Sequence, residues 1–320
     1  MALEMPKVQG VDHMFVRGGD LEFHLAVAGE GAPVLLLHGW PEHWYAWRDV
    51  MPRLAEGRRV LAMDLRGFGW TDIAWEGFDK ESMADDVARV LDAMEIRRVA
   101  VIGHDWGGWI GLLLAMRHPA LVEKLVVLGS PPPWARPYPA SAVGARRLRQ
   151  HALIASPLGR HLLQRGVGRR HASMGSPLGR RLVHRGIGLP ARQIRRFAAE
   201  RGSVGEEALT IYTRDLKAST RARAGSLLHR TFLTREVRRL LAGRYRDARL
   251  TTPTLVLHGE RDRLFSPAAY RAHERHADDL RLDVVAGAGH YLPEEAPQVV
   301  AERALEFIGA GGAPPAAADR

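Results

Sequence analysis

The chain has 320 residues, of which 46% are hydrophobic and 26% charged, so it can bury a sizeable core and has the composition of an ordinary globular protein. It contains no cysteine, and this excludes disulfides, thiolate metal sites and thiol catalysis. Its formal net charge of +10 raises the question of a nucleic-acid or membrane partner.

The N-terminal residues carry no targeting signal that we recognise. Residues 1–10 have neither an apolar core nor an Arg-rich amphipathic stretch. The longest apolar run, Trp109 to Met116, is far shorter than the roughly 20 residues needed to cross a bilayer. We therefore expect a cytoplasmic protein without a transmembrane segment.

The first 130 residues alternate between short apolar strands and amphipathic or apolar helices. Two alternating stretches that meet at Gly18-Gly19-Asp20 predict a β-hairpin over residues 12–28. Short apolar runs predict strands, and longer segments with helical periodicity predict helices. After the hairpin, the predicted strands are 33–37, 59–63, 98–102 and 125–128, and the predicted helices are 82–94 and 106–117.

The same rhythm returns after residue 250. Strands are predicted over 253–257 and 281–285, and helices over 267–276 and 294–308. Such an alternation is typical of an α/β protein whose parallel sheet is covered by helices on both faces. The Gly/Ala/Pro-rich residues 310–320 are predicted to form a disordered tail.

Between these two regions, residues 131–250 contain no predicted strand. The segment begins with three prolines and continues as short Arg-rich helices broken by Gly and Pro. Residues 156–168 recur as residues 176–188, with nine of 13 paired positions identical, which indicates a duplicated helical element. We predict an all-helical cap at 131–250, inserted into a core domain made of residues 1–130 and 251–309.

The net charge is divided unevenly between these two domains. Residues 131–250 contain 26 Lys/Arg and 6 Asp/Glu, a net of +20, which leaves 46 − 26 = 20 basic and 36 − 6 = 30 acidic residues elsewhere. An acidic core therefore carries a basic cap, which is compatible with an anionic substrate or surface. The cap lacks the aromatic residues interleaved with basic ones that typify single-stranded nucleic-acid binding, so we expect no nucleic-acid partner.

A candidate nucleophile lies in the acidic core. The predicted strand 98–102 leads through Gly103-His104-Asp105-Trp106-Gly107-Gly108 into a helix, which is the pattern of a nucleophile elbow. The glycines allow a tight turn that raises the central side chain above the sheet. Here that residue is Asp105 rather than serine, and a carboxylate can attack an electrophilic carbon to form an alkyl-enzyme ester.

Two further catalytic candidates also follow strands. Asp262 comes after strand 253–257 and His290 after strand 281–285. The carboxyl ends of parallel strands meet at one edge of a sheet, so we expect Asp105, Asp262 and His290 to lie together there. In such a triad Asp262 orients the imidazole, and His290 deprotonates water.

The segment His38-Gly39-Trp40-Pro41 follows strand 33–37 at the same edge. Its backbone can supply the Trp40 N–H to an oxyanion hole, with the Trp106 N–H as the second donor. Pro41 is a candidate for a cis peptide bond.

Several of these segments together resemble the α/β-hydrolase-fold epoxide hydrolases over about residues 10–130 and 250–308. The resemblance is carried by His38-Gly39-Trp40-Pro41-Glu42, Trp44-Tyr45-Ala46-Trp47-Arg48, Asp64-Leu65-Arg66-Gly67-Phe68-Gly69 and Gly103-His104-Asp105-Trp106-Gly107-Gly108. It implies a mostly parallel eight-stranded sheet with an inserted helical cap. It further implies that Asp105 opens an epoxide to form an ester, and that water activated by His290 and Asp262 releases the vicinal diol, with no metal or cofactor.

The cap departs from the family pattern. These enzymes usually open the ring with two cap tyrosines that hydrogen-bond the epoxide oxygen and donate a proton. The position expected for one of them, before Arg230, holds His229, and the region expected for the other holds His151. Tyr212 is a third candidate proton donor, although a tyrosine in mid-helix is more often a packing residue.

Two other functions stay open. A haloalkane dehalogenase would use the same Asp105 and would hold the halide with Trp106 and a second indole, from Trp109 or Trp134; the chain has no Asn to supply that donor. A ligand-binding or regulatory protein that kept the fold but lost turnover is the alternative outside enzymology. A small epoxide and water are the expected partners, and a homodimer is possible.

Overall fold

The computed structural model describes residues 4–135, 142–164 and 189–309, and one eight-stranded sheet forms its centre. The strand order is β1-β2-β4-β3-β5-β6-β7-β8; β1 pairs with β2 and β2 with β4 antiparallel, and all other pairs are parallel. The predicted mostly parallel eight-stranded sheet is confirmed. The strands are β1 (Asp12–Gly18), β2 (Leu21–Ala28), β3 (Ala32–Leu37), β4 (Arg58–Met63), β5 (Val99–His104), β6 (Val122–Leu128), β7 (Thr254–Gly259) and β8 (Leu280–Val285).

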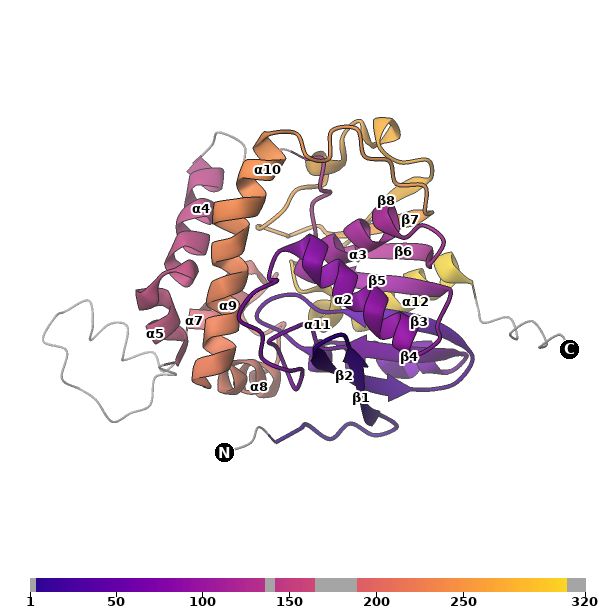
Figure 1. Cartoon of the computed structure of the whole chain (residues 1–320), viewed down its shortest axis with the longest axis horizontal. Coiled ribbons are helices and arrows are strands. Elements are labelled where there is room, and N and C mark those ends of the chain that lie inside the picture. The colour runs from indigo at the N-terminus through magenta and orange to yellow at the C-terminus, as the bar shows by residue number, and fades with distance from the viewer. Residues whose placement is uncertain (1–3, 136–141, 165–188, 310–320) are drawn as a thin grey trace, which may run out of the picture.

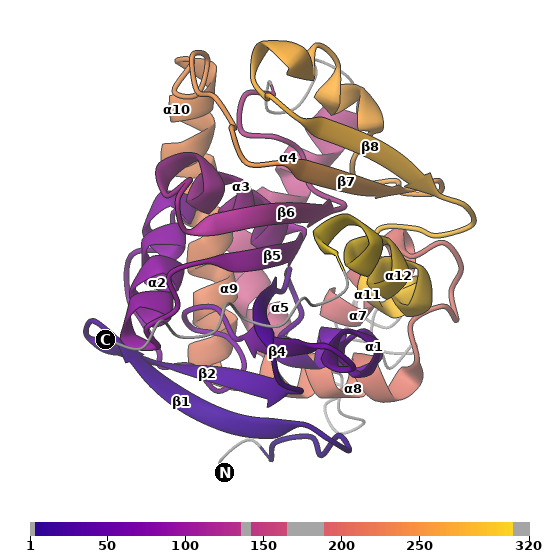
Figure 2. The same ribbon diagram turned by 90° about the vertical axis from the view of Figure 1, so that its right-hand side faces the viewer.

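Helices cover both faces of the sheet (Figure 2). Along β3, Leu35 and Leu37 pack with the helices of one face, and Val34 and Leu36 with those of the other. All four side chains are fully buried, which is why this strand reads as a continuous apolar run. One face carries α2 (Lys80–Ala93) and α3 (Trp106–Arg117), and the other carries α1 (Met51–Ala55), α11 (Leu292–Glu295) and α12 (Pro297–Ile308).

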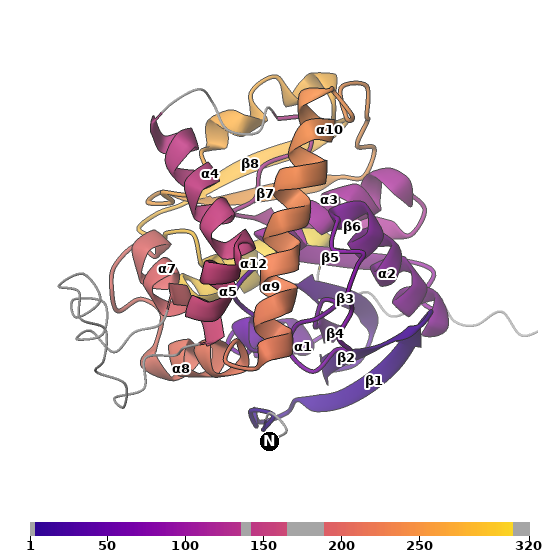
Figure 3. The same cartoon turned by 60° about the vertical axis from the view of Figure 1, so that its left-hand side comes forward.

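In the described part of residues 142–241 all the regular secondary structure is helical, and these helices stand beside the sheet (Figures 1 and 3). The longest helical segment is formed by α9, the π-helical turn η2 and α10 in succession. Helices α4 and α5 pack alongside α9. The second copy of the duplicated segment and the predicted disordered tail lie outside the described residues. The helices are α4 (Ala142–Ala155), α5 (Pro157–Gln164), α7 (Leu189–Phe197), α8 (Glu206–Asp215), α9 (Ser219–Thr231), η2 (Phe232–Glu236) and α10 (Val237–Leu241). No described helix is both long and apolar enough to cross a membrane.

Two predicted helices of the C-terminal region differ from the structure. In place of one helix over 267–276 there are two 3₁₀ turns, η3 (Pro267–Tyr270) and η4 (His273–Arg275). Ala272 between them has a left-handed φ of 58°, which interrupts the helix. The other helix begins earlier than predicted, at Leu292, and is divided at Pro297, which has no N–H to continue the hydrogen-bond ladder of α11.

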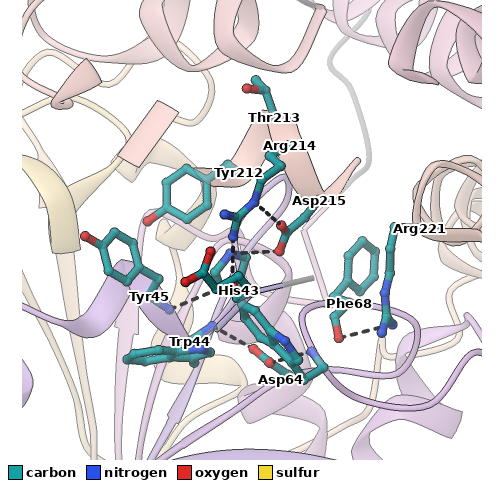
Figure 4. Close-up of polar contacts among 12 residues, drawn as sticks. His43, Trp44, Tyr45, Asp64, Phe68, Tyr212, Thr213, Arg214, Asp215 and Arg221 are labelled. Atoms are coloured by element: carbon teal, nitrogen blue, oxygen red, sulfur yellow. Dashed lines mark hydrogen bonds and ion pairs between the residues drawn. The ribbon is translucent and has the colours of Figure 1, made fainter. Parts of the chain in front are cut away.

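The cap helices α8 and α9 meet the core at a buried polar junction (Figure 4). His43 Nε2 lies 3.2 Å from Asp215 Oδ2 at the end of α8. Arg221 in α9 donates to the carbonyl oxygen of Thr71 at 2.6 Å. Burial raises the pKa of the Asp215 carboxyl to about 6 and lowers the pKa of His43 to about 3, so near neutral pH a carboxylate is buried here beside a neutral imidazole.

This junction predicts a pH-dependent stability. The folded-state pKa of Asp215 is raised above its unfolded value of 3.8, so its contribution to stability is greatest below pH 3.8 and is lost as the pH rises to about 6. We expect Asp215→Asn to stabilise the protein by about 2 kcal/mol at pH 8 and to have little effect at pH 4. Urea unfolding of both proteins at the two pH values measures the difference. An effect that is the same at pH 4 and pH 8 would contradict this account.

Candidate active site

Asp105 occupies the strained turn between β5 and α3. Its φ of 49° and ψ of −116° lie outside the regions that most residues adopt. The flanking glycines are required by close packing: a Cβ on Gly103 would lie 2.4 Å from the Gly107 carbonyl oxygen, and a Cβ on Gly107 would lie 2.1 Å from the Leu37 carbonyl oxygen. The turn therefore has the geometry of the predicted nucleophile elbow.

The two oxygens of the Asp105 carboxylate have different surroundings. Oδ2 accepts a hydrogen bond from the Trp40 N–H at 3.1 Å. Oδ1 faces His290 Nε2 at 3.8 Å, which is longer than a direct hydrogen bond. Burial raises the pKa of Asp105, while the charges of His290 and His104 and the Trp40 N–H oppose that rise. The carboxylate thus has one oxygen held by the backbone and the other turned toward an imidazole.

Asp262 orients this imidazole. His290 Nδ1 lies 3.1 Å from Asp262 Oδ2, and the second oxygen of Asp262 accepts from the N–H groups of Leu264 and Phe265 at 2.6 and 3.1 Å. Although burial opposes ionisation, His290 and these two N–H groups hold the pKa of Asp262 below its usual value. An ionised Asp262 accepts a hydrogen bond from the Nδ1–H of His290, and in this tautomer the lone pair of Nε2 faces Asp105. The structure brings all three predicted side chains together.

The segment after β3 is fixed tightly against the nucleophile. A Cβ on Gly39 would lie 2.6 Å from the Cβ of Asp105, so only glycine fits here. His38 donates from Nδ1 to the Gly39 carbonyl at 2.7 Å and accepts at Nε2 from the Leu65 N–H at 3.0 Å. The Trp40–Pro41 peptide bond is cis.

These contacts position the first proposed oxyanion donor, Trp40. The second proposed donor is the N–H of Trp106, which is the first residue of α3 and follows Asp105 directly. Among the described residues it forms no hydrogen bond to the Asp105 carboxylate.

A second buried ion pair, between Glu42 and His104, was not predicted from the sequence. His104 Nδ1 lies 2.8 Å from Glu42 Oε2, and its Nε2 lies 2.9 Å from the carbonyl oxygen of His290. Both ring nitrogens face acceptors, so both must carry protons to donate, which requires the imidazolium. Burial opposes this charge, but Glu42 raises the pKa of His104 to about 9. The pair joins the loop after β3, the end of β5 and the loop that carries His290.

A buried lysine below the elbow is the other feature that the sequence did not reveal. Lys80 is 0% exposed, and its Nζ lies 2.6 Å from Glu236 Oε2 in the cap turn η2. The Lys80 backbone N–H also donates to Glu236 Oε1 at 2.8 Å. The ammonium lies 4.1 Å from the ring centroid of Trp106, the residue after the nucleophile. Burial lowers the pKa of Lys80, and Glu236 opposes that shift.

We expect Lys80→Met to destabilise the protein by about 3 kcal/mol, because it leaves the Glu236 carboxylate buried without its cation. Glu236→Gln in addition should recover more than half of this loss, since a neutral amide costs less to bury than an unpaired charge. Urea unfolding of the wild type, both single variants and the double variant completes the cycle. If Lys80→Met lowered the free energy of unfolding equally in the wild type and in Glu236→Gln, the ion pair would be excluded as the cause.

Above the elbow lies a cavity of about 980 Å³ between the core and the cap helices. Its lining is largely aromatic and aliphatic, and it includes Asp105 and both predicted oxyanion residues. Two cap candidates, His151 and His229, line it as well, with ring centroids 5.0 Å apart. No group of three or more His, Asp or Glu side chains among the described residues is placed to bind a metal ion.

His229 is held in a particular protonation state. Its Nδ1 lies 2.8 Å from the Gly225 carbonyl oxygen, one helical turn earlier, so Nδ1 carries the proton and donates it. Burial, with a smaller contribution from the nearby Lys80, lowers the pKa of His229 to about 3. In this neutral form Nε2 has a lone pair and no proton to give. His229 therefore presents a hydrogen-bond acceptor, whereas the sequence suggested a proton donor.

The third candidate, Tyr212, packs against the rings of His43 and Tyr45 in the core (Figure 4). It is fully buried and is absent from the cavity lining, and its hydroxyl donates to Glu294. Glu294 in turn accepts two hydrogen bonds from Arg48, at 2.7 and 2.8 Å. The prediction of Tyr212 as a cavity proton donor is therefore wrong: the tyrosine lies on the face of α8 that packs against the core.

The same architecture occurs in known proteins. A family model described as the alpha/beta hydrolase fold matches residues 32–297. The chain belongs to this family. It is 30% identical to the soluble epoxide hydrolase of Corynebacterium sp. (strain C12) over 294 residues, covering 89% of this chain and 93% of that protein. It is also 42% identical to human epoxide hydrolase 4 over 127 residues, which cover 38% of this chain and 35% of that protein.

Solved structures give the same assignment. The epoxide hydrolase CorEH without ligand superposes with a TM-score of 0.73 at 29% identity, covering 93% of this chain and 98% of that one. The protein is thus an epoxide-hydrolase-like α/β hydrolase, as the sequence motifs predicted.

Proposed function

We propose that the protein hydrolyses epoxides to vicinal diols through an ester on Asp105. The observation that carries this proposal is the asymmetry of the nucleophile, with Oδ2 bonded to the Trp40 N–H and Oδ1 turned toward His290 Nε2. In this scheme the core, residues 1–130 and 251–309, supplies the reacting groups. The cap, residues 131–250, closes over the substrate.

In the first step a carboxylate oxygen of Asp105 attacks one carbon of the epoxide. A carbon–oxygen bond forms to the enzyme, the ring carbon–oxygen bond breaks, and its electron pair remains on the former ring oxygen as an alkoxide. This alkoxide takes a proton to become the first hydroxyl of the diol. The strained turn holds the buried Asp105 carboxylate above the sheet, in the lining of the cavity, where such an attack has room.

We assign the proton donor to His151 in its protonated form. His151 lines the cavity with His229, and its ring centroid lies 5.8 Å from that of Trp106. The Nδ1–H of His229 is engaged as a donor to the Gly225 carbonyl oxygen, so its Nε2 acts as a hydrogen-bond acceptor that holds the donor or the nascent hydroxyl. In the family pattern the proton donors are two neutral tyrosines, whereas here the proton donor is a cationic imidazolium.

In the second step water attacks the ester carbonyl carbon, which is Cγ of Asp105. His290 Nε2 removes a proton from that water, and Asp262 stabilises the resulting imidazolium. The negative charge on the tetrahedral intermediate is stabilised by the N–H groups of Trp40 and Trp106. Collapse breaks the bond to the substrate oxygen, which takes the proton back from His290, so the diol leaves and Asp105 is regenerated.

An isotope experiment tests this order of events. In a single turnover in H₂¹⁸O with enzyme in excess, the ester route places an oxygen of Asp105 in the diol, so the first diol contains no ¹⁸O and the enzyme acquires it. Mass spectrometry of the diol and of the peptide that carries Asp105 reads both. If the first diol carried ¹⁸O, water would attack the epoxide directly and the ester would be excluded.

A haloalkane dehalogenase is the second candidate, because a specific feature of the cavity favours it. The indole nitrogens of Trp109 and Trp134 are buried in the cavity lining with no hydrogen-bond partner among the described residues. Such donors can stabilise a leaving halide beside Trp106. A parallel assay of epoxides, haloalkanes and carboxylic esters, scored for diol, halide and acid, distinguishes the two chemistries.

A further inference from the structure

The cavity extends well beyond the nucleophile. Asp105 follows β5, whereas Arg271 and Arg275 lie in the η3–η4 segment that follows β7, and all three residues line the same cavity. Strand β6 separates β5 from β7 in the sheet. Neighbouring strands are about 4.8 Å apart, so the two ends of the cavity are separated by roughly 10 Å or more. Figure 2 shows the η3–η4 segment beyond β7 and β8, on the far side of the sheet from β1.

The permanent charges of the lining are separated in the same way. Asp105 is the one carboxylate among the described lining residues, and Arg271 and Arg275 are the two side chains that are always cationic. Neither arginine forms a side-chain hydrogen bond or ion pair with any residue that the structure describes. By contrast, Arg249 is paired with Asp278 and Arg261 with Glu200. The cavity rim therefore carries two guanidinium groups whose charge no described carboxylate neutralises.

Buried donors lie along the route between the two ends. Ser130 Oγ and the indole nitrogen of Trp134 are buried in the lining without a hydrogen-bond partner among the described residues. The Trp134 ring stacks on His276, with centroids 5.0 Å apart and planes at 13°. Buried polar groups normally have partners, so unpaired donors inside a cavity indicate a ligand with acceptor oxygens. Most of the other lining residues are apolar and suit a hydrocarbon chain, and Gln150, Gln193 and Ser266 add polar groups to the wall.

We infer that the substrate is an elongated apolar epoxide with a terminal oxyanion, which Arg271 and Arg275 bind while the epoxide lies at Asp105. This inference rests on the proposed function. A carboxylate and a phosphate share the oxyanion chemistry that guanidinium groups recognise. An extended alkyl chain of about eight to ten carbons spans the roughly 10 Å between the two ends. The anion site belongs to the core, and none of the described arginines of the basic cap lines the cavity.

Turnover gives the first test. The probes are 10,11-epoxyundecanoic acid, its methyl ester, and the phosphate monoester of 10,11-epoxyundecanol. We expect the ratio of kcat/KM for the acid to that for the methyl ester to fall about tenfold in Arg271→Gln/Arg275→Gln, because each exposed pair contributes modestly. Arg303→Gln, on the exposed face of α12, is the matched control and should leave the ratio unchanged. High salt should lower the ratio in the wild type.

The phosphate monoester identifies the head group, since the probe with the larger loss in the double variant carries the preferred anion. The inference is overturned if wild-type kcat/KM at low salt is equal for the acid and the methyl ester. It is also overturned if the double variant leaves the acid-to-ester ratio unchanged. Either result leaves epoxide hydrolysis itself intact.

Binding gives a second test that needs no turnover. Calorimetry measures the affinity of decanoate, decyl phosphate and decanol for the wild type and for the Arg271→Gln/Arg275→Gln variant. We expect at least one anion to bind about tenfold more tightly than decanol, and this preference to be lost in the variant. If that preference were present but no epoxide were hydrolysed, the anion site would stand and the proposed function would fail. Equal affinities for the two anions and decanol would exclude the site.

Discussion

Asp105→Ala should abolish diol formation while the protein stays folded. Among the described residues that line the cavity, Asp105 is the one carboxylate that could form the ester, so we expect its removal to lower kcat by about four to six orders of magnitude, the scale seen when a covalent nucleophile is deleted. The thermal unfolding midpoint should change little, because the removed carboxylate is buried and its ionised form is disfavoured there. Diol release by chromatography and a thermal melt are the two measurements.

The matched control for this variant is Asp20→Ala, an exposed residue in the turn between β1 and β2. It removes one carboxylate from the surface and should leave turnover unchanged. Diol formation by Asp105→Ala at the wild-type rate would exclude the ester mechanism. A large drop in the thermal unfolding midpoint of this variant would show that its loss of activity comes from unfolding.

His290→Gln should trap the ester. Attack by Asp105 does not need His290 as a base, whereas hydrolysis does, so the alkylated enzyme should accumulate with a mass increase equal to that of the whole epoxide. His290 also lowers the pKa of Asp105, so its removal favours the protonated nucleophile and the trapping is best performed near pH 8. Intact-protein mass spectrometry after a few minutes with excess epoxide detects the adduct.

The adduct must require the nucleophile. Asp105→Ala/His290→Gln should show no mass increase under the same conditions, and peptide mapping of the single variant should place the adduct on Asp105. Consumption of epoxide by His290→Gln without any adduct would contradict the two-step scheme, because it would mean that hydrolysis proceeds without the imidazole.

The three residues that we propose to react could be located from the sequence because each follows a strand. Asp105, Asp262 and His290 lie directly after β5, in the loop after β7 and in the loop after β8, and a parallel sheet brings such positions to one edge. Glycine spacing added the conformation of the turn at Asp105, since the close approaches at Gly103 and Gly107 allow no side chain. The mostly parallel sheet followed from the same alternation of short strands and helices.

The groups that support them could not be predicted, because their partners are distant in the chain. Glu42 and His104 are 62 residues apart, and Lys80 and Glu236 are 156 apart. A lysine at the first position of an amphipathic helix is ordinarily solvated, so nothing local marks Lys80 as buried. Tyr212 failed for a related reason: the sequence places it in a helix but does not say which face of α8 packs on the core.

The state of His229 had a local signal that was overlooked. In a helix, the side chain of a residue can reach the carbonyl oxygen four residues earlier, here that of Gly225, and this contact decides which ring nitrogen carries the proton. This spacing therefore permits a neutral His229 that donates from Nδ1 and accepts at Nε2, although we predicted it only as a proton donor. Only the burial of the ring decides between these two states.

The contact between Lys80 and Glu236 limits how this enzyme can be recombined with its relatives. A cap grafted from another member of the family would replace Glu236 but leave Lys80 beneath Trp106, with a buried ammonium and no carboxylate to meet it. Exchanges of the cap should therefore carry position 80 along with the helices, and a library that shuffles only residues 131–250 should lose folded members unless the donor cap supplies an acid at position 236.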